Sequence, residues 1–124
     1  MKKHHPGFLR IVDAAKARIQ EVTAQEVLSA CAAGRAPLIV DVRERSEWEA
    51  GHVLDAIHLS KGILERDVEA AVPDRDAELV LYCGGGFRSA LSADALQQMG
   101  YTQVRSLAGG WRAWKAASGP VQEP

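Results

Sequence analysis

The chain has 124 residues, a formal net charge of -1 and two cysteines. This length supports one domain with a hydrophobic core and is too short for two of ordinary size. The balanced charge excludes the broad basic surface typical of nucleic-acid binding, and no apolar run predicts a secretory signal or a membrane span. Two cysteines without a disulfide framework are typical of a reducing compartment, so we expect a cytoplasmic protein with no nucleic-acid or membrane partner.

The first part of the chain predicts two helices with a short strand between them. Residues 8–18 carry apolar side chains at helical spacing, and residues 19–22 form the strand candidate. Thr23 and Glu26 have the spacing of a capping box, which begins a helix that ends at Gly34. Cys31 lies in this helix between alanines, with no charge or glycine loop nearby. This setting favours a structural cysteine over a resolving thiol.

The rest of the chain alternates strand and helix patterns. The β-branched run at residues 38–42 is typical of a strand buried on both faces of a parallel sheet. The remaining predicted strands are residues 56–59, 79–82 and 104–107, and the remaining predicted helices are residues 63–72, 90–99 and a closing segment. Trp48, Trp111 and Trp114 are interpreted as core anchors. This alternation predicts an α/β fold with a central, mostly parallel sheet flanked by helices on both faces.

Three segments follow from this organisation. We expect an N-terminal helical extension at residues 1–21, a single domain at residues 22–117 and a loose C-terminal tail at residues 118–124. No internal repeat, low-complexity tract or interdomain linker interrupts the domain.

The most informative feature is a glycine-rich loop that follows the strand at residues 79–82. Cys83 is followed by Gly84, Gly85 and Gly86, and a helical pattern begins close to Arg88. Adjacent glycines permit backbone conformations closed to other residues and can turn several N–H groups toward one point. A helix N-terminus and the Arg88 cation would both favour a negative charge there. The pattern predicts a nucleophilic cysteine, and a buried structural cysteine would not explain three glycines and an arginine.

Four segments, in order along the chain, carry a resemblance to a known family. They are residues 41–44 (DVRE), 51–53 (GHV), 83–89 (CGGGFRS) and 107–111 (LAGGW). Together they resemble the single-domain rhodanese-like sulfurtransferases, and the resemblance covers residues 22–114. The loop alone would be moderately specific, because short loops from cysteine to arginine occur in unrelated thiol enzymes.

The resemblance implies a fold and a chemistry. The implied fold is the rhodanese-like central parallel sheet, with the active cysteine on a six-residue loop. The Cys83 thiolate would take a sulfane sulfur from a donor, become a persulfide and pass that sulfur to a nucleophilic acceptor, with thiosulfate and cyanide as a donor and acceptor in vitro. Arg88 would order the loop and offset negative charge. Binding of the outer sulfur is implied for the loop residues Gly84, Gly85, Gly86, Phe87 and Ser89.

The same reasoning extends to cofactors, partners and supporting residues. No cofactor is expected besides the covalent persulfide on Cys83, and the partners are a small sulfur donor and a thiophilic acceptor, with a sulfur-relay protein left open. Asp41 and Arg43 are interpreted as an architectural pair, and His52 as a hydrogen-bonding residue of the loop scaffold. No metal site is expected, because neither His52 nor His58 has a cluster of ligands at metal-binding spacing.

One residue departs from the family pattern in a way that affects the donor. Glu47 lies near a position that is arginine in some members that use thiosulfate. If this acid faces the mouth of the site, it would repel a dianion and disfavour thiosulfate as the physiological donor.

Two other functions remain open from the sequence. A thiol phosphatase or arsenate reductase also presents a cysteine and an arginine around an anion cradle, although phosphatase loops typically contain one more residue than the four between Cys83 and Arg88. A non-catalytic rhodanese-like interaction or regulatory module is the other alternative. Such modules often lack the cysteine, which this chain retains.

Overall fold

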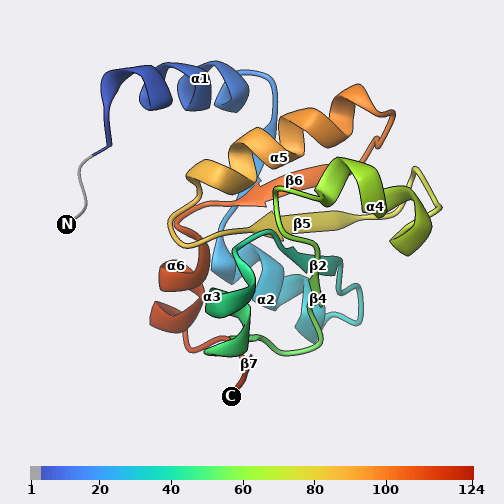
Figure 1. The fold of residues 1–124 in the computed structure, drawn as a ribbon. Helices are drawn as coiled ribbons and strands as arrows, with labels where there is room; N and C mark the ends of the chain where they lie inside the picture. The colour runs from blue at the N-terminus through green and yellow to red at the C-terminus, as the bar shows by residue number, and fades with distance from the viewer. Residues whose placement is uncertain (1–3) are drawn as a thin grey trace.

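The structure is a computed structural model and describes residues 4–124. Its strands are β1 (Gln20–Val22), β2 (Leu38–Asp41), β3 (His52–Val53), β4 (Ile57–His58), β5 (Leu79–Tyr82), β6 (Val104–Leu107) and β7 (Val121–Gln122). Its helices are α1 (Pro6–Lys16), α2 (Ala24–Ala32), α3 (Arg45–Glu49), α4 (Leu64–Ala71), α5 (Phe87–Gln98) and α6 (Gly110–Ala116). Figure 1 shows them in chain order.

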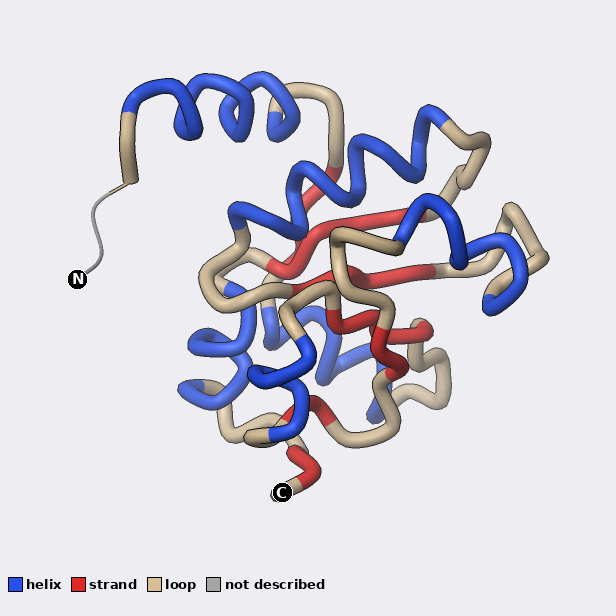
Figure 2. The backbone as a smooth tube through the Cα atoms, viewed as in Figure 1, coloured by secondary structure: helices blue, strands red, loops and turns tan. Residues whose placement is uncertain are grey.

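A five-stranded sheet in the order β1-β6-β5-β2-β4 forms the centre of the domain, and every neighbouring pair in it is parallel. Helices α4 and α5 lie on one face of this sheet, and α2 and α6 lie on the other (Figures 1 and 2). The predicted α/β fold with helices on both faces is therefore confirmed. Because the strands are parallel, their carboxyl ends share one edge, which is where open α/β sheets bind ligands.

The alternation of side chains along β5 explains why this strand is apolar throughout. Leu79 and Leu81 belong to the hydrophobic cluster that includes residues of α4 and α5. Val80 and Tyr82 belong to the cluster that includes residues of α2 and α6. Successive side chains of a strand point to opposite faces, so a sheet covered on both sides needs an unbroken apolar run.

The N-terminal part of the chain follows the expected pattern. The capping box at the start of α2 is formed in full, since the Glu26 amide donates to Thr23 Oγ1 at 3.1 Å and the Thr23 amide donates to Glu26 Oε1 at 2.9 Å. Cys31 is exposed on α2. The expected extension, residues 1–21, includes three residues that lie outside the described ones, and its last two residues already belong to β1. Within residues 4–124, no helix has the length and apolar character needed to cross a membrane.

The expectation of a loose tail at residues 118–124 is wrong. Strand β7 pairs antiparallel with β3, and the Pro120 carbonyl accepts hydrogen bonds from the Leu54 amide at 3.1 Å and from the Trp114 indole at 2.9 Å. A two-residue strand leaves no periodicity in the sequence, so only the tertiary contacts define it.

Gly119 provides a test of how firmly the tail is held. A Cβ atom built on Gly119 would lie 2.2 Å from Cε2 of the Trp114 indole, whereas one on Gly62 would meet nothing within 4 Å. We expect Gly119→Ala to lower the free energy of unfolding by about 1–3 kcal/mol, because overpacking forces the indole or the tail to shift. Denaturant unfolding measures this, with Gly62→Ala as the control. Equal stability of the two variants would contradict the described packing of the tail.

Candidate active site

Three parallel strands converge on the site at the carboxyl edge of the sheet. Strand β2 ends at Asp41, β5 leads directly into Cys83, and β6 leads into the turn before α6. Asp41 is paired in register with Tyr82, the residue before the cysteine. Segments that are far apart in the sequence therefore meet around one sulfur atom.

The Cys83 sulfur accepts hydrogen bonds from its own loop. The Gly86 amide lies 3.2 Å from Sγ and the Ser89 amide 3.3 Å from it. The Ser89 hydroxyl is 3.5 Å from Sγ and 2.8 Å from the buried Ser106 hydroxyl on β6. Because Ser89 lies in the first turn of α5, its amide has no partner within the helix and is free to bind the sulfur. The loop is therefore built to place N–H groups on this atom.

Helix α6 orients the first part of the loop. The Trp111 amide donates to the Cys83 carbonyl at 2.7 Å, and the Arg112 amide donates to the Gly84 carbonyl at 3.3 Å. In a trans peptide the carbonyl and the next N–H point in opposite directions, so the amides of Gly84 and Gly85 point away from the α6 backbone. Neither of these two amides donates a hydrogen bond to residues 4–124. They remain available to a ligand.

The glycines of the loop serve different purposes. Only Gly86 has a left-handed φ, of 99°, and a Cβ there would lie 3.2 Å from the Gly109 amide nitrogen. The conformational freedom that adjacent glycines permit is therefore used at Gly86 and not at Gly84 or Gly85. A Cβ on either would instead contact a guanidinium, that of Arg88 or Arg112, at 3.4 Å. At this distance a methyl group would make an ordinary van der Waals contact, so the two guanidinium groups lie close against the loop backbone.

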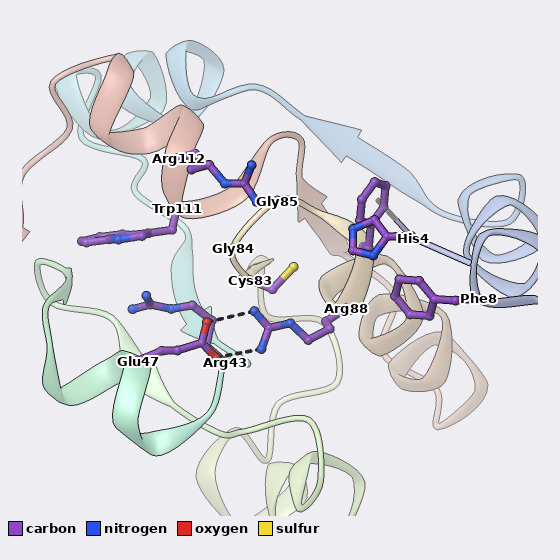
Figure 3. Close-up of a pocket in the computed structure, with 11 residues that line it drawn as sticks. His4, Phe8, Arg43, Glu47, Cys83, Gly84, Gly85, Arg88, Trp111 and Arg112 are labelled. Atoms are coloured by element: carbon purple, nitrogen blue, oxygen red, sulfur yellow. Dashed lines mark hydrogen bonds and ion pairs between the residues drawn. The ribbon is translucent and has the colours of Figure 1, made fainter. Parts of the chain in front are cut away.

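A cavity of about 700 Å³ opens over the loop. Cys83 lines it although the residue as a whole is only 1% exposed. Figure 3 shows the sulfur at its centre, with Trp111 and Arg112 on one side and His4 and Phe8 on the other. The lining residues are His4, Phe8, Arg43, Glu47, Cys83, Gly84, Gly85, Phe87, Arg88, Trp111 and Arg112.

Arg88 is paired with Glu47 in a two-point contact. Its Nη1 donates to Glu47 Oε1 at 2.8 Å and its Nη2 to Oε2 at 3.0 Å (Figure 3). Hydrogen bonds from Arg88 lower the pKa of Glu47 from 4.5 to about 2, while the same hydrogen bonds raise the pKa of Arg88. The Glu47 carboxylate therefore stays ionised unless the pH falls toward 2. The acid lines the cavity and largely neutralises the arginine of the loop.

Asp41 and Arg43 form a buried pair below the cavity. Arg43 donates to the carboxylate from Nε and Nη2, the closest contact being 2.7 Å, and also donates to the Gly51 carbonyl at 2.8 Å. The Tyr82 hydroxyl donates to Asp41 Oδ2 at 2.6 Å and accepts the Val53 amide at 3.0 Å. Burial, followed by the hydrogen bond to Asp41, raises the pKa of Tyr82. This network fixes the segment that carries Glu47.

The histidines near the site hold backbone carbonyls. His52 Nδ1 lies 3.2 Å from the Trp48 carbonyl, and its ring stacks on the Trp48 indole with centroids 3.3 Å apart. His58 Nε2 lies 2.8 Å from the Arg43 carbonyl. Within residues 4–124, no group of three or more histidine, cysteine, aspartate or glutamate side chains could hold a metal ion.

Several lining residues are missing from the sequence-based prediction. Trp111 packs against the hydrophobic core as expected, and it also lines the cavity, with its ring centroid 4.8 Å from the Arg43 guanidinium carbon. Arg112 follows it, and His4 and Phe8 reach the cavity from the N-terminal extension. Ser106 is a polar residue in the strand-like run at residues 104–107. It is the one local signal that could have indicated a buried hydrogen bond to the site.

The fold and the site together define an α/β domain with a cysteine in an amide-lined loop at the carboxyl edge of a parallel sheet. The family model for the rhodanese-like domain matches residues 23–117, which is most of the chain. The protein belongs to the rhodanese-like domain family.

Known relatives include sulfurtransferases. The chain is 37% identical over 79 residues to thiosulfate sulfurtransferase GlpE from Coxiella burnetii, covering 64% of this chain and 72% of that protein. It is 30% identical over 106 residues to a sulfurtransferase from Allochromatium vinosum, covering 86% of this chain and 97% of that protein.

A solved structure resembles almost the whole chain. It is a protein of unknown function from Rhodopseudomonas palustris, described as a possible tyrosine phosphatase. The TM-score is 0.86 at 30% identity, and the match covers 98% of this chain and 99% of that chain. Coverage this high includes α1, so the N-terminal helix is part of the shared fold.

Proposed function

We propose that this protein is a sulfurtransferase that carries a sulfane sulfur as a persulfide on Cys83. Its partners are a small sulfur donor and a thiophilic acceptor, which could be the cysteine of a sulfur-relay protein. The proposal is supported by the geometry around Sγ and by membership of a family that contains sulfurtransferases.

The reaction takes place in two half-reactions. With thiosulfate, the Cys83 thiolate attacks the outer sulfur, an S–S bond forms, the S–S bond of thiosulfate breaks, and sulfite leaves with the electron pair. An acceptor nucleophile such as cyanide then attacks the outer sulfur of the persulfide, takes it as thiocyanate and restores the thiolate. The first product leaves before the acceptor reacts, and the enzyme alternates between the thiolate and the persulfide, so ping-pong kinetics are expected.

The observation that carries the proposal is the set of N–H groups around the cysteine. Two amides already contact Sγ, and those of Gly84 and Gly85 have no acceptor within residues 4–124. A persulfide extends from Sγ by one large, polarizable anionic atom, and preorganised amides stabilise such a charge without a bulky side chain. The free amides beside the sulfur match this requirement.

Thiocyanate formation tests the proposal directly. Purified protein incubated with a sulfane-sulfur donor and cyanide is expected to release thiocyanate with parallel double-reciprocal lines, as a ping-pong mechanism requires. Donors should include thiosulfate and an organic persulfide. Absence of sulfur transfer from every donor would contradict the proposal and favour an interaction module.

The Glu47–Arg88 pair predicts a low kcat/KM for thiosulfate. A single substitution at Glu47 should raise it. In Glu47→Gln the amide oxygen still accepts the Glu44 amide at the start of α3. The charge that repels a dianion is removed, and the positive charge of Arg88 is no longer neutralised. We expect kcat/KM for thiosulfate to rise about fivefold, the size of a partly exposed charge interaction.

A control variant and the pH dependence provide two further tests of this prediction. Glu49→Gln removes an exposed carboxylate paired with Arg45 on the same helix and should leave kcat/KM unchanged. Because the pKa of Glu47 is about 2, the gain in Glu47→Gln should be constant at neutral and alkaline pH. A fall in kcat/KM for thiosulfate in Glu47→Gln would show that the pair positions Arg88 for the dianion instead of blocking it.

A thiol phosphatase is the second candidate, because the Rhodopseudomonas palustris protein of similar structure is described as a possible tyrosine phosphatase. Two observations favour sulfur transfer over it in this chain. Only four residues separate Cys83 from Arg88, and Arg88 is committed to Glu47 rather than left free for a phosphate. Hydrolysis of an aryl phosphate that is lost in Cys83→Ser would reverse this order.

A further inference from the structure

Helix α1 is anchored on α5 at the edge of the cavity. Val12 and Ala15 on α1 are fully buried, and α1 packs along α5. Beyond its C-terminal end, Arg18 donates to both carboxylate oxygens of Asp94 at 2.9 and 2.7 Å. The Arg18 carbonyl accepts the Gln97 side-chain amide at 2.9 Å. Helix α1 is therefore a fixed part of the domain, which gives Phe8 in its first turn a defined place.

The N-terminal end of α1 provides an aromatic wall for the cavity. The His4 ring packs edge-on against Phe87 of the cysteine loop with centroids 4.6 Å apart, and the Phe8 ring lies 6.2 Å from Phe87 in the same orientation. Lys16 contacts the same Phe87 ring at 5.1 Å. All three rings line the cavity and are only partly buried. In Figure 3, His4 and Phe8 lie on the side of the Cys83 sulfur opposite Trp111 and Arg112.

On the opposite side of the cavity, Arg112 is the one lining arginine that has no ion-pair partner among residues 4–124. Of the three arginines that line it, Arg43 is paired with Asp41 and Arg88 with Glu47. Arg112 has no ion pair within residues 4–124, and its guanidinium lies close to Gly85, whose amide is also free. One unpaired cation together with two free amides suits a group with one negative charge better than a compact dianion beside Glu47.

We propose that α1 makes this site selective for a sulfane-sulfur donor that combines one anionic group with an aromatic or other apolar group, such as an organic thiosulfonate or an organic persulfide. The inference rests on the proposed sulfur transfer at Cys83. A cavity of about 700 Å³ is much larger than thiosulfate needs and has the size of sites that hold organic ligands. The anionic end lies toward Arg112 and the apolar group lies against Phe8 and Phe87.

The transfer step is balanced for this class of donor. The Cys83 thiolate attacks the outer sulfur of a thiosulfonate, the new S–S bond makes the persulfide, and the S–S bond of the donor breaks. The leaving group is a sulfinate, which departs with the electron pair and keeps the single negative charge. With an organic persulfide, the same attack on the outer sulfur breaks the S–S bond of the donor, and a thiolate leaves with the electron pair. No further oxidant or reductant is required.

A pair of thiosulfonates tests the aromatic wall. Benzenethiosulfonate and methanethiosulfonate carry the same charge and differ in the ring, so the ratio of their kcat/KM values with cyanide as acceptor reports on the apolar contact. We expect Phe8→Ala to lower this ratio about three- to tenfold, the range of one aromatic contact. Phe8→Tyr keeps the ring and should keep the ratio.

Matched controls separate this effect from a loss of structure. Ile11 lies on the same helix, is 54% exposed and does not line the cavity, so Ile11→Ala should leave the ratio unchanged. Arg112→Gln should lower kcat/KM for both thiosulfonates by a similar factor, whereas Arg35→Gln, an exposed arginine outside the cavity, should change neither. Far-ultraviolet circular dichroism of each variant verifies that α1 remains folded.

The outcomes distinguish this inference from the function it rests on. Sulfur transfer with a ratio that is the same in wild type and Phe8→Ala would overturn the role of α1 and leave the sulfurtransferase proposal standing. Failure of the wild-type protein to take sulfur from thiosulfate or from either thiosulfonate would overturn the proposed function itself. A ratio that falls in Phe8→Ala and is unchanged in Ile11→Ala would support both the role of α1 and the sulfurtransferase proposal.

Discussion

The Cys83→Ser variant is expected to lose sulfur transfer by more than about 10³-fold, the scale seen when the nucleophile of a covalent enzyme is removed. A serine oxygen cannot form a persulfide, so no intermediate accumulates and no thiocyanate is released. The Gly86 and Ser89 amides that contact Sγ can still donate to the serine hydroxyl, so the loop is expected to keep its conformation. The loss would therefore reflect the chemistry of residue 83 and not an unfolded loop.

The second cysteine supplies the control for this experiment. Cys31 is exposed on α2 and does not line the cavity. The Cys31→Ser variant should retain the wild-type rate of thiocyanate formation in the same assay. If Cys83→Ser remained active and Cys31→Ser did not, the site described above would be in the wrong place.

The largest effect on stability is expected from Asp41→Asn. Asp41 is completely buried and accepts hydrogen bonds from Arg43 and from the Tyr82 hydroxyl. The asparagine has nearly the same shape, so no cavity forms, but the Arg43 cation, whose residue is 3% exposed, loses its counter-charge. Leaving a buried charge unpaired costs about 3–5 kcal/mol, a large share of the 5–15 kcal/mol typical of a domain.

Denaturant unfolding measures this loss of stability, and a variant that breaks an exposed ion pair serves as the comparison. Glu49→Gln breaks the Arg45–Glu49 pair on the surface of α3, which should cost less than about 1 kcal/mol. A loss in Asp41→Asn no greater than that in Glu49→Gln would show that Arg43 finds another partner or reaches water. If Asp41→Asn were as stable as the wild type but transferred sulfur more slowly, the network would act by positioning the site and not by stabilising the fold.

Features that are local in sequence were predictable. The apolar run of β5 predicted a strand covered on both faces, and the capping box at Thr23 predicted the start of α2. The loop after Cys83 was evident because its glycines and its helix start are consecutive. In each case the physical cause acts within a few residues, so the feature can be predicted from the local sequence.

Features that depend on packing between distant segments were not predictable. The Arg88–Glu47 pair joins residues 41 positions apart, and only the placement of α3 against the loop brings them together. Phe8 reaches the cavity because α1 packs along α5, which helical periodicity cannot reveal. Trp111 packs against the core as expected, but its place at the cavity depends on how α6 meets the loop and was not evident from the sequence.

Intact-mass spectrometry of the wild-type protein after exposure to a panel of sulfane-sulfur donors tests the central claim most directly. The account predicts a gain of one sulfur atom, located on the peptide that contains Cys83 and removed by cyanide. A protein that gains no sulfur from thiosulfate, a thiosulfonate or an organic persulfide, or that gains it only on Cys31, would contradict the account.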